Sequence, residues 1–374
     1  MERNVKHVLY QRLLILIAAF FYYSGLVALF RWWQRHFTDS LVILGYHEAS
    51  GGDLRSHLTY LKRHYRIQHL EQALDELYYP SRQHMPKDTG RAPLAVTFDD
   101  GYRDNYTVGF PLVRELGVPV TLFLASGYIE SGKPFWWQEE PLSTHVRERE
   151  IVFGGRLYHI DRQDEREALK REFADHVFYA SSVAQREAYL HTVHASPSAS
   201  SPTSKAERAT FTWAEAREME TSGWVSFGAH TVHHPVLAYL TDMQELADEV
   251  RDCRAALERH LGRQLRCFAY PIGGFEHFGP RGLAMVEQAH YDWAVTAIEG
   301  FNTPHTNPYL LHRFIVDVNQ HWLLVAAKTC GVWGFFTALC RFPARFVRGL
   351  WADEPLPLHI FAQEKTKELP KVEV

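Results

Sequence analysis

The chain has 374 residues, enough to bury a large hydrophobic core in one big domain or two smaller ones. Its formal net charge is −4, so it lacks the overall basic field that would favour a nucleic-acid-binding protein. The four cysteines form no CxxC pair, which excludes a zinc ribbon and leaves the redox compartment open.

Residues 13–30 contain no charged side chain, and arginines flank the run on both sides. This length is close to the minimum for a membrane-spanning helix, and Trp32 and Trp33 suit the headgroup region of a bilayer. No small-x-small cleavage site follows, which argues against a secretory signal peptide. We therefore predict a hydrophobic membrane-anchor helix within residues 1–37, with a buried helix of a soluble domain as the alternative.

Short apolar runs that alternate with helix-like segments predict a parallel β-sheet. Residues 41–46, 94–98 and 118–124 are typical of buried strands. Further strands are predicted at 224–229, 265–270, 291–297 and 311–316, and helices at 54–77 with a break near 65–70, at 111–116, at 212–221 and at 241–261. This order predicts a barrel-like α/β domain with helices outside.

Two segments depart from that pattern. Residues from about 138 to 210 are charged and helix-prone and then Ser/Pro-rich, which predicts an insertion ending in a flexible loop. Residues 322–351 are aromatic and basic, so we expect amphipathic helices lying on the domain or on a membrane surface. The predicted organisation is an anchor at 1–37, a main domain at 38–320 and a C-terminal extension with a loose tail at 321–374.

Two adjacent carboxylates, Asp99 and Asp100, follow the predicted strand at 94–98. Consecutive residues at a strand end point in different directions, so one carboxylate can bind a cation while the other takes a proton. Gly101 permits the sharp exit that exposes both at the carboxyl end of the strand, where α/β folds place their sites. An isolated Asp-Asp-Gly is more often an ordinary turn, so the hypothesis depends on partners elsewhere.

A histidine cluster follows the predicted strand at 224–229. His230 and His234 are four residues apart and can face one cation from a turn. His233 is the competing ligand at a spacing of three. A single histidine would be read as a surface residue, but this cluster and the aspartate pair both follow strands. The sequence therefore predicts a metal site.

An aromatic patch at Phe135, Trp136 and Trp137 follows the predicted strand at 118–124. These rings could pack as a cluster at a helix start. They could equally form a platform for a sugar ring, because aromatic faces suit the C–H faces of sugars. The sequence leaves both interpretations open.

Taken together, TFDDGY at 97–102 and HTVHHP at 230–235 resemble the motifs of the polysaccharide deacetylases, the NodB-homology family or carbohydrate esterase family 4. The resemblance extends over residues 41–317 apart from the insertion, and includes FAYPIG at 268–273. It implies a distorted, TIM-like (β/α) barrel for the domain at 38–320.

The resemblance also implies a divalent cation, usually Zn²⁺, held by one aspartate and two histidines. The implied ligands are Asp100, His230 and His234, and the implied general base is Asp99. In the family, the cation acidifies a water molecule and polarises the acetamide carbonyl. A site with one oxygen and two nitrogen donors agrees with that chemistry.

The loop after residue 269 is the implied substrate and oxyanion site. It contains Tyr270, Pro271 and the backbone N–H of Ile272. Many relatives carry an arginine that holds the base aspartate where this chain has Ala269. We take Arg313 as the candidate replacement for that arginine.

Two histidines compete for the role of general acid. Family members commonly use a histidine near the C-terminal end of the barrel, where His312 lies, but its LLHRF context matches that motif poorly. A subgroup that resembles the biofilm poly-N-acetylglucosamine deacetylases instead has Tyr-His at the first strand, as at Tyr46-His47 here. A strand-end histidine can protonate the leaving amine, so His47 is the preferred candidate.

The sequence thus predicts a membrane-anchored, metal-dependent hydrolase that removes N-acetyl groups from a sugar of a cell-surface or exported polysaccharide. One alternative is a deacetylase of a lipid-linked sugar or glycolipid, and another is a non-catalytic member that binds glycan or acts as a scaffold. The expected location is a bacterial inner membrane, with the domain facing the periplasm or exterior and with no nucleic-acid partner.

Overall fold

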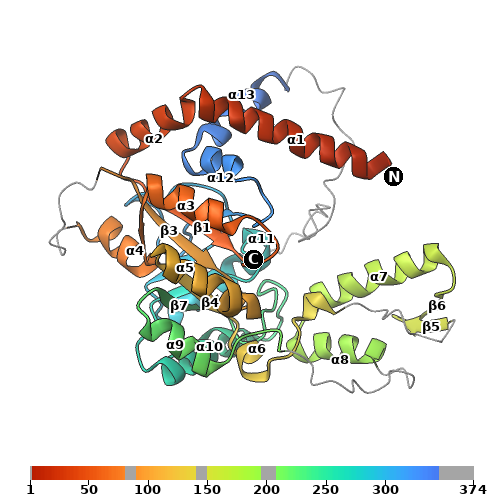
Figure 1. The fold of residues 1–374 in the computed structure, drawn as a ribbon. Helices are drawn as coiled ribbons and strands as arrows, with labels where there is room; N and C mark the ends of the chain where they lie inside the picture. The colour runs from red at the N-terminus through yellow and green to blue at the C-terminus, as the bar shows by residue number, and fades with distance from the viewer. Residues whose placement is uncertain (1, 81–89, 140–149, 195–207, 345–374) are drawn as a thin grey trace, which may run out of the picture.

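The computed structural model describes residues 2–80, 90–139, 150–194 and 208–344. At its centre is a curved parallel sheet, in which β10, β1, β3, β4, β7, β8 and β9 are neighbours in that order and β2 pairs with β3 (Figure 1). The strands are β1 (Val42–Tyr46), β2 (Arg66–Gln68), β3 (Pro93–Phe98), β4 (Val120–Leu124), β7 (Val225–Ala229), β8 (Cys267–Ala269), β9 (Trp293–Val295) and β10 (Phe314–Ile315). A parallel bridge between Val295 and Leu311 links the far edge to the segment before β10, so the sheet curls into a barrel. The predicted distorted (β/α) barrel is confirmed.

Helices connect most successive strands, as parallel crossovers usually require, whereas residues 296–313 between β9 and β10 contain no helix. Those of the barrel are α3 (Leu54–His64), α4 (Leu70–Tyr78), the short π-helix η2 (Asn105–Gly109), α5 (Phe110–Leu116), α6 (Ser126–Ser131), η3 (Trp136–Gln138), α9 (Trp213–Thr221), α10 (Met243–Leu261) and α11 (Phe275–Gln288). Strands β1 and β4 are buried along their whole length, because helices cover the sheet. Thr212 caps α9 by a capping box with Glu215.

The insertion forms a β-hairpin and two helices. They are β5 (Glu150–Phe153), β6 (Arg156–His159), α7 (Gln163–Phe178) and α8 (Val183–His194), and they extend from one end of the barrel (Figure 1). The helices agree with the prediction, but the hairpin was not predicted. Its signal is Gly154-Gly155, both with positive φ, because two-residue hairpin turns favour such pairs. The predicted Ser/Pro-rich loop lies outside the described residues.

The N-terminal segment forms two helices, α1 (Glu2–Tyr23) and α2 (Leu26–Phe37), joined at an angle of 65°. Gly25 adopts a left-handed conformation with φ 84°, which ends the straight path of α1. The prediction of one continuous helix across residues 13–30 is therefore wrong, and the membrane anchor within residues 1–37 remains a prediction. No single helix among the described residues is long and apolar enough to cross a membrane, and only the bent pair passes that test, by length and composition.

The C-terminal helices α12 (Trp322–Thr329) and α13 (Val332–Ala344) pack beside α1 (Figure 1). The Phe21 ring lies 6.4 Å from that of Trp333 and 5.2 Å from that of Phe336. Helix α12 is almost wholly buried, with Leu323 through Ala327 in the hydrophobic core, so it is not the surface helix that we expected. The remainder of the predicted C-terminal extension, residues 345–374, lies outside the described residues.

Candidate functional site

Four strand ends bring the predicted site residues together. His47 follows β1, Asp99 and Asp100 follow β3, and His230 and His234 follow β7. The loop after β8 completes this carboxyl edge of the sheet. The backbone N–H of Asp99 donates to the carbonyl of Tyr46 at 2.9 Å, which joins the ends of β3 and β1.

Asp100, His230 and His234 form a buried cluster with one ligand atom from each side chain, all within 4.8 Å of one another. The Asp100 Oδ1 atom lies 3.4 Å from His230 Nε2 and 3.5 Å from His234 Nε2. Oδ1 has no hydrogen-bond partner among the described residues, which is uncommon for a buried carboxylate. One oxygen and two imidazole nitrogens are a donor set that Zn²⁺ accepts. The cluster therefore fits a divalent cation.

The orientation of His230 supports that fit. Its Nδ1 lies 2.7 Å from the carbonyl oxygen of Ala269, and a carbonyl only accepts, so Nδ1 carries a proton and donates it. Nε2 then faces Asp100, which is the arrangement of a metal-binding histidine held by a backbone carbonyl. Burial opposes protonation of His230, but the adjacent Asp100 and Asp99 raise its pKa, and the same negative charges would attract a cation. Burial lowers the pKa of His234 to about 3, so its imidazole is neutral.

The backbone of the site is strained. Among the described residues, five non-glycine residues have positive φ, and four of them belong to these loops: Asp100 (71°), Thr231 (66°), His234 (53°) and Ile272 (63°). Such conformations cost about 1–3 kcal/mol each, and they persist only where the surroundings fix them. The loops are thus held in place by contacts from neighbouring elements.

Glu249, on α10, holds the histidine loop. Its buried carboxylate accepts from the backbone N–H groups of Val232 at 3.0 Å and His233 at 2.8 Å, and it pairs with His233 Nδ1 at 2.6 Å. This pairing turns His233 away from Asp100, so the structure separates the competing histidine from the cluster.

Arg186, on α8 of the insertion, reaches the same loop. It is 2% exposed, and it donates to the carbonyl of His233 at 3.0 Å and to that of His234 at 3.4 Å. Its guanidinium carbon lies 5.4 Å from the centre of the Trp136 ring, in cation–π contact. Neither Arg186 nor Glu249 was predicted from the sequence. Each lies in a charged helix, where no local pattern distinguishes a buried ionic side chain from an exposed one.

Asp99 forms a buried, two-pronged ion pair with Arg313. The two guanidinium nitrogens lie 2.7 and 2.8 Å from the two carboxylate oxygens, and Arg313 also donates to the carbonyl of Thr296 at 2.8 Å. Burial alone would raise the pKa of Asp99, but Arg313 and His230 outweigh it and lower that pKa to about 2. Asp99 is thus ionised and can accept a proton. Arg313 thus pairs with Asp99, as we predicted for a chain that has Ala269 where many relatives carry an arginine.

A protein-family model described as polysaccharide deacetylase matches residues 86–278, which is just over half of the chain. The chain belongs to the polysaccharide deacetylase family. The matched stretch contains both the Asp99-Asp100 pair and the His230–His234 loop. The protein is therefore a hydrolase, a carbohydrate de-N-acetylase.

Solved deacetylase structures share this fold. IcaB from Ammonifex degensii is 21% identical, and the match covers 78% of this chain and 97% of that one with a TM-score of 0.51. The Streptococcus pyogenes deacetylase PplD, solved in complex with acetate, is 18% identical, with 78% and 98% covered and a TM-score of 0.50. At this identity the likeness concerns the fold alone. A search of curated proteins finds no match.

The two candidate general acids of this deacetylase lie in different places. His47 is close enough that its charge lowers the pKa values of Asp99 and Asp100. Arg313 lies just before β10, and its guanidinium reaches Asp99. Its neighbour His312 packs against Gly300, and the Nδ1 atom of His312 has no partner among the described residues. The structure thus brings His47, and not His312, to the site.

The aromatic patch borders the metal-ligand cluster. The ring of Trp137 lies 4.4 Å from that of His234, and its Nε1 donates to the Tyr102 hydroxyl at 2.8 Å. Trp136 is buried and donates to the carbonyl of His234 at 3.0 Å. The packing interpretation therefore applies to Trp136, which lies behind the loop. The partly exposed Trp137 flanks the site, where its role as a sugar platform remains a prediction.

The predicted substrate loop also divides into packing and exposed groups. Tyr270 is buried and stacks on Phe278 at 3.9 Å, so it belongs to the core. Ile272 follows the buried Pro271, and its N–H has no hydrogen-bond partner among the described residues. This N–H is available to a ligand, as the sequence analysis expects.

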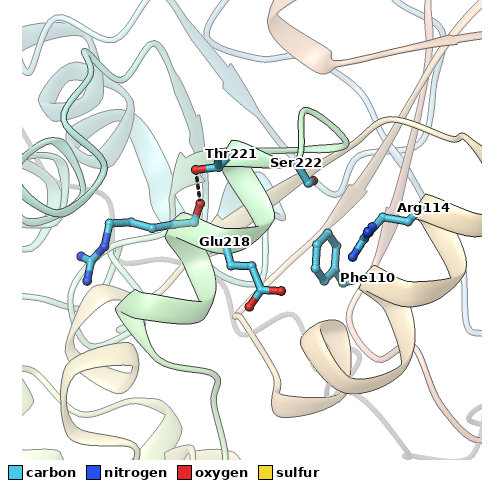
Figure 2. Close-up of a pocket in the computed structure, with 6 residues that line it drawn as sticks. Phe110, Arg114, Glu218, Thr221 and Ser222 are labelled. Atoms are coloured by element: carbon cyan, nitrogen blue, oxygen red, sulfur yellow. Dashed lines mark hydrogen bonds between the residues drawn. The ribbon is translucent and has the colours of Figure 1, made fainter.

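A separate surface depression lies between α5 and α9 (Figure 2). It is lined by Phe110, Arg114, Arg217, Glu218, Thr221 and Ser222. None of the predicted site residues lines it. Its walls carry both charge signs and a single carboxylate, that of Glu218, so we assign it no role in the reaction.

The Glu249 contacts give a stability prediction. Glu249→Ala leaves the N–H groups of Val232 and His233 and the His233 ring without their acceptor. We expect a loss of about 1–3 kcal/mol in the free energy of unfolding, measured by chemical denaturation. Asp248→Ala, at an exposed position on the same helix, is the matched control and should change stability by less than about 0.5 kcal/mol. Equal effects of the two variants would contradict a supporting role for Glu249.

Proposed function

We propose that this deacetylase is metal-dependent and removes N-acetyl groups from a sugar of a cell-surface or exported polysaccharide. One observation carries the proposal: the buried, unpartnered Asp100 Oδ1 faces the Nε2 atoms of His230 and His234 beside an ionised second carboxylate. Family membership supports it, as does the acetate bound in the similar PplD structure, because acetate is a product of deacetylation.

Asp100, His230 and His234 would hold the cation, and Zn²⁺ is the metal that this donor set favours. A bound divalent cation would supply a Lewis acid that makes water more acidic and polarises the amide carbonyl. The remaining steps fall to side chains and backbone groups of the chain itself.

Asp99 would accept a proton on a carboxylate oxygen as water attacks the acetyl carbon, and Arg313 keeps that carboxylate ionised and oriented. The N–H of Ile272 would donate to the carbonyl oxygen as negative charge develops there. His47 would give a proton to the amine nitrogen as the C–N bond breaks. A new C–O bond replaces that bond, and the products are acetate and a free amine.

Trp137 would contact the sugar. Its ring is partly exposed beside His234, and aromatic faces pack well against the C–H faces of sugar rings. This contact would place the acetamide group over the cluster without selecting a particular linkage.

Two alternative functions differ in their support. The non-catalytic interpretation was motivated by the missing arginine at Ala269, and the Arg313–Asp99 ion pair removes that motive. A lipid-linked sugar or glycolipid substrate is favoured by the exposed apolar side chains of α1 and α2. Comparison of acetate release from soluble oligosaccharides and from lipid-linked acceptors separates the two substrate classes.

Metal content and acetate release together test the proposed chemistry. We expect one divalent cation per wild-type chain, retained in Asp99→Asn while acetate release falls by about 10²-fold or more. Asp100→Asn should lose both metal and activity, because it removes a charged ligand. Asp248→Asn is the exposed control and should behave as wild type. Full metal content and activity in Asp100→Asn, or a metal-loaded wild type inactive on every N-acetylated glycan tried, would overturn the proposal.

Removal of the arginine should change the pH dependence. In Arg313→Gln, burial raises the pKa of Asp99 with only the charges of His230 and His47 to oppose it, so the acidic limb of the kcat/KM profile moves to higher pH. We expect a loss of about 10²-fold at pH 7 and partial recovery at alkaline pH or in Arg313→Lys. The control is Arg55→Gln, which breaks an exposed pair with Glu115. An unshifted profile would show that Arg313 only stabilises the fold.

The general acid can be identified by comparison of two histidines. His47→Gln should reduce kcat by about 10²–10⁴-fold and remove the basic limb of its pH profile, because no group then protonates the amine. His312→Gln, remote from the cluster, should change kcat by less than about twofold. The reverse pattern would assign the role to His312.

A further inference from the structure

Helix α1 exposes an apolar stripe on the side that faces away from the barrel. Leu9, Leu13, Leu16, Phe20 and Tyr23 recur at helical spacing, and each is more than half exposed. The opposite side of α1 is buried against α12 and α13. From Leu13 to Tyr23 the helix is therefore apolar on both sides, which is not expected for a helix on an ordinary protein surface.

The exposed side chains continue onto α2 and α13. Leu29, Trp32, Trp33 and Phe37 are each about half exposed, and Phe335 is 60% exposed. The rings of Phe30 and Phe335 lie 5.6 Å apart, which joins α2 to α13. We call this set and the α1 stripe the apolar face; it consists of Leu9, Leu13, Leu16, Phe20, Tyr23, Leu29, Trp32, Trp33, Phe37 and Phe335. The three helices gather on one side of the molecule, with α12 between α1 and the barrel (Figure 1).

The charge of the same segments is mostly positive. Residues 3–38 contain four arginines and one lysine but no aspartate or glutamate, and Glu2 is the one acidic residue of α1. Residues 322–352 likewise contain lysine and arginine but no acidic residue. The whole chain is acidic, with 44 acidic and 40 basic side chains, so this composition is local. An apolar surface with mostly basic charges around it complements an anionic, apolar partner.

We propose that the apolar face binds the surface of an anionic phospholipid bilayer, with α1 and α2 lying in the membrane plane. A bend of 65° between two consecutive helices is compatible with both of them lying on the surface of a bilayer. Tryptophan and tyrosine favour the headgroup region, and the apolar side chains reach the start of the acyl chains. A second copy of this chain is a poorer partner, because two such faces would bring the basic side chains of both copies together, and like charges repel.

This inference is independent of the proposed reaction, since no residue of the apolar face touches the Asp100 cluster. It replaces the spanning helix that the sequence analysis expects with an interfacial one. The full chain has to be used for the test. Deletion of α1 would uncover core side chains such as Leu324 and Val325, so point substitutions on the exposed stripe are the suitable variants.

The test is co-sedimentation of the full-length protein with vesicles of phosphatidylglycerol and phosphatidylethanolamine, and with vesicles of phosphatidylcholine alone. We expect binding to the anionic vesicles that weakens at least tenfold on phosphatidylcholine or in 0.5 M salt. The double variant Leu16→Glu/Phe20→Glu should lose at least tenfold in vesicle affinity. Its acetate release from soluble oligosaccharides should equal that of wild type, which shows that it folds.

The matched control is Val152→Glu/Leu157→Glu. It introduces the same charges at exposed apolar positions of the insertion hairpin, and it should keep vesicle binding. Three outcomes overturn the proposal. The first is vesicle binding that survives Leu16→Glu/Phe20→Glu, and the second is resistance of the bound protein to alkaline carbonate extraction, which indicates a spanning segment. The third is that wild type binds no vesicles but forms a homodimer, which this double substitution dissociates.

Discussion

The buried ion pair between Asp99 and Arg313 is the interaction on which the site depends. Removing two charges from water is costly, and only the paired geometry with additional hydrogen bonds offsets that cost. Arg313 meets this condition through the carbonyl of Thr296 and both oxygens of Asp99. The pair forms because the curled sheet places β10 beside β1, and β1 beside β3.

The metal-ligand cluster depends on a second constraint, the strained loop that carries its histidines. Positive φ at Thr231 and His234 is unfavourable for side chains with a Cβ atom, so the loop needs external support. Glu249 provides it from α10, and Arg186 provides it from the insertion. The insertion is thus part of the site's scaffold, although it extends from one end of the barrel. Its helix α8 also packs Trp136 against the back of the loop by the cation–π contact.

The metal-ligand cluster and the apolar face are built from different elements. The strand ends carry polar groups whose arrangement is fixed by backbone hydrogen bonds, whereas the apolar face is formed by helices packed around α12. If the apolar face lies on a bilayer, the protein works at the membrane without a spanning helix. The enzyme would then bind its substrate, either a polymer or a lipid-linked sugar, at the membrane surface.

The sequence determined the elements and the chemistry at their ends. Apolar runs predicted the strands, and Thr212 and Gly25 show how single residues start a helix or end one. The Asp99-Asp100 and His230–His234 motifs predicted the cluster, because adjacent strand ends in a parallel sheet share one edge.

The tertiary structure decided which side chains support that chemistry. The choice of His234 over His233, the pairing of Asp99 with Arg313, and the approach of Arg186 all depend on contacts between residues distant in the sequence. The burial of α12 likewise follows from packing, which no local hydrophobic pattern records. Local sequence specifies how a segment folds, but the curl of the sheet determines which segments meet.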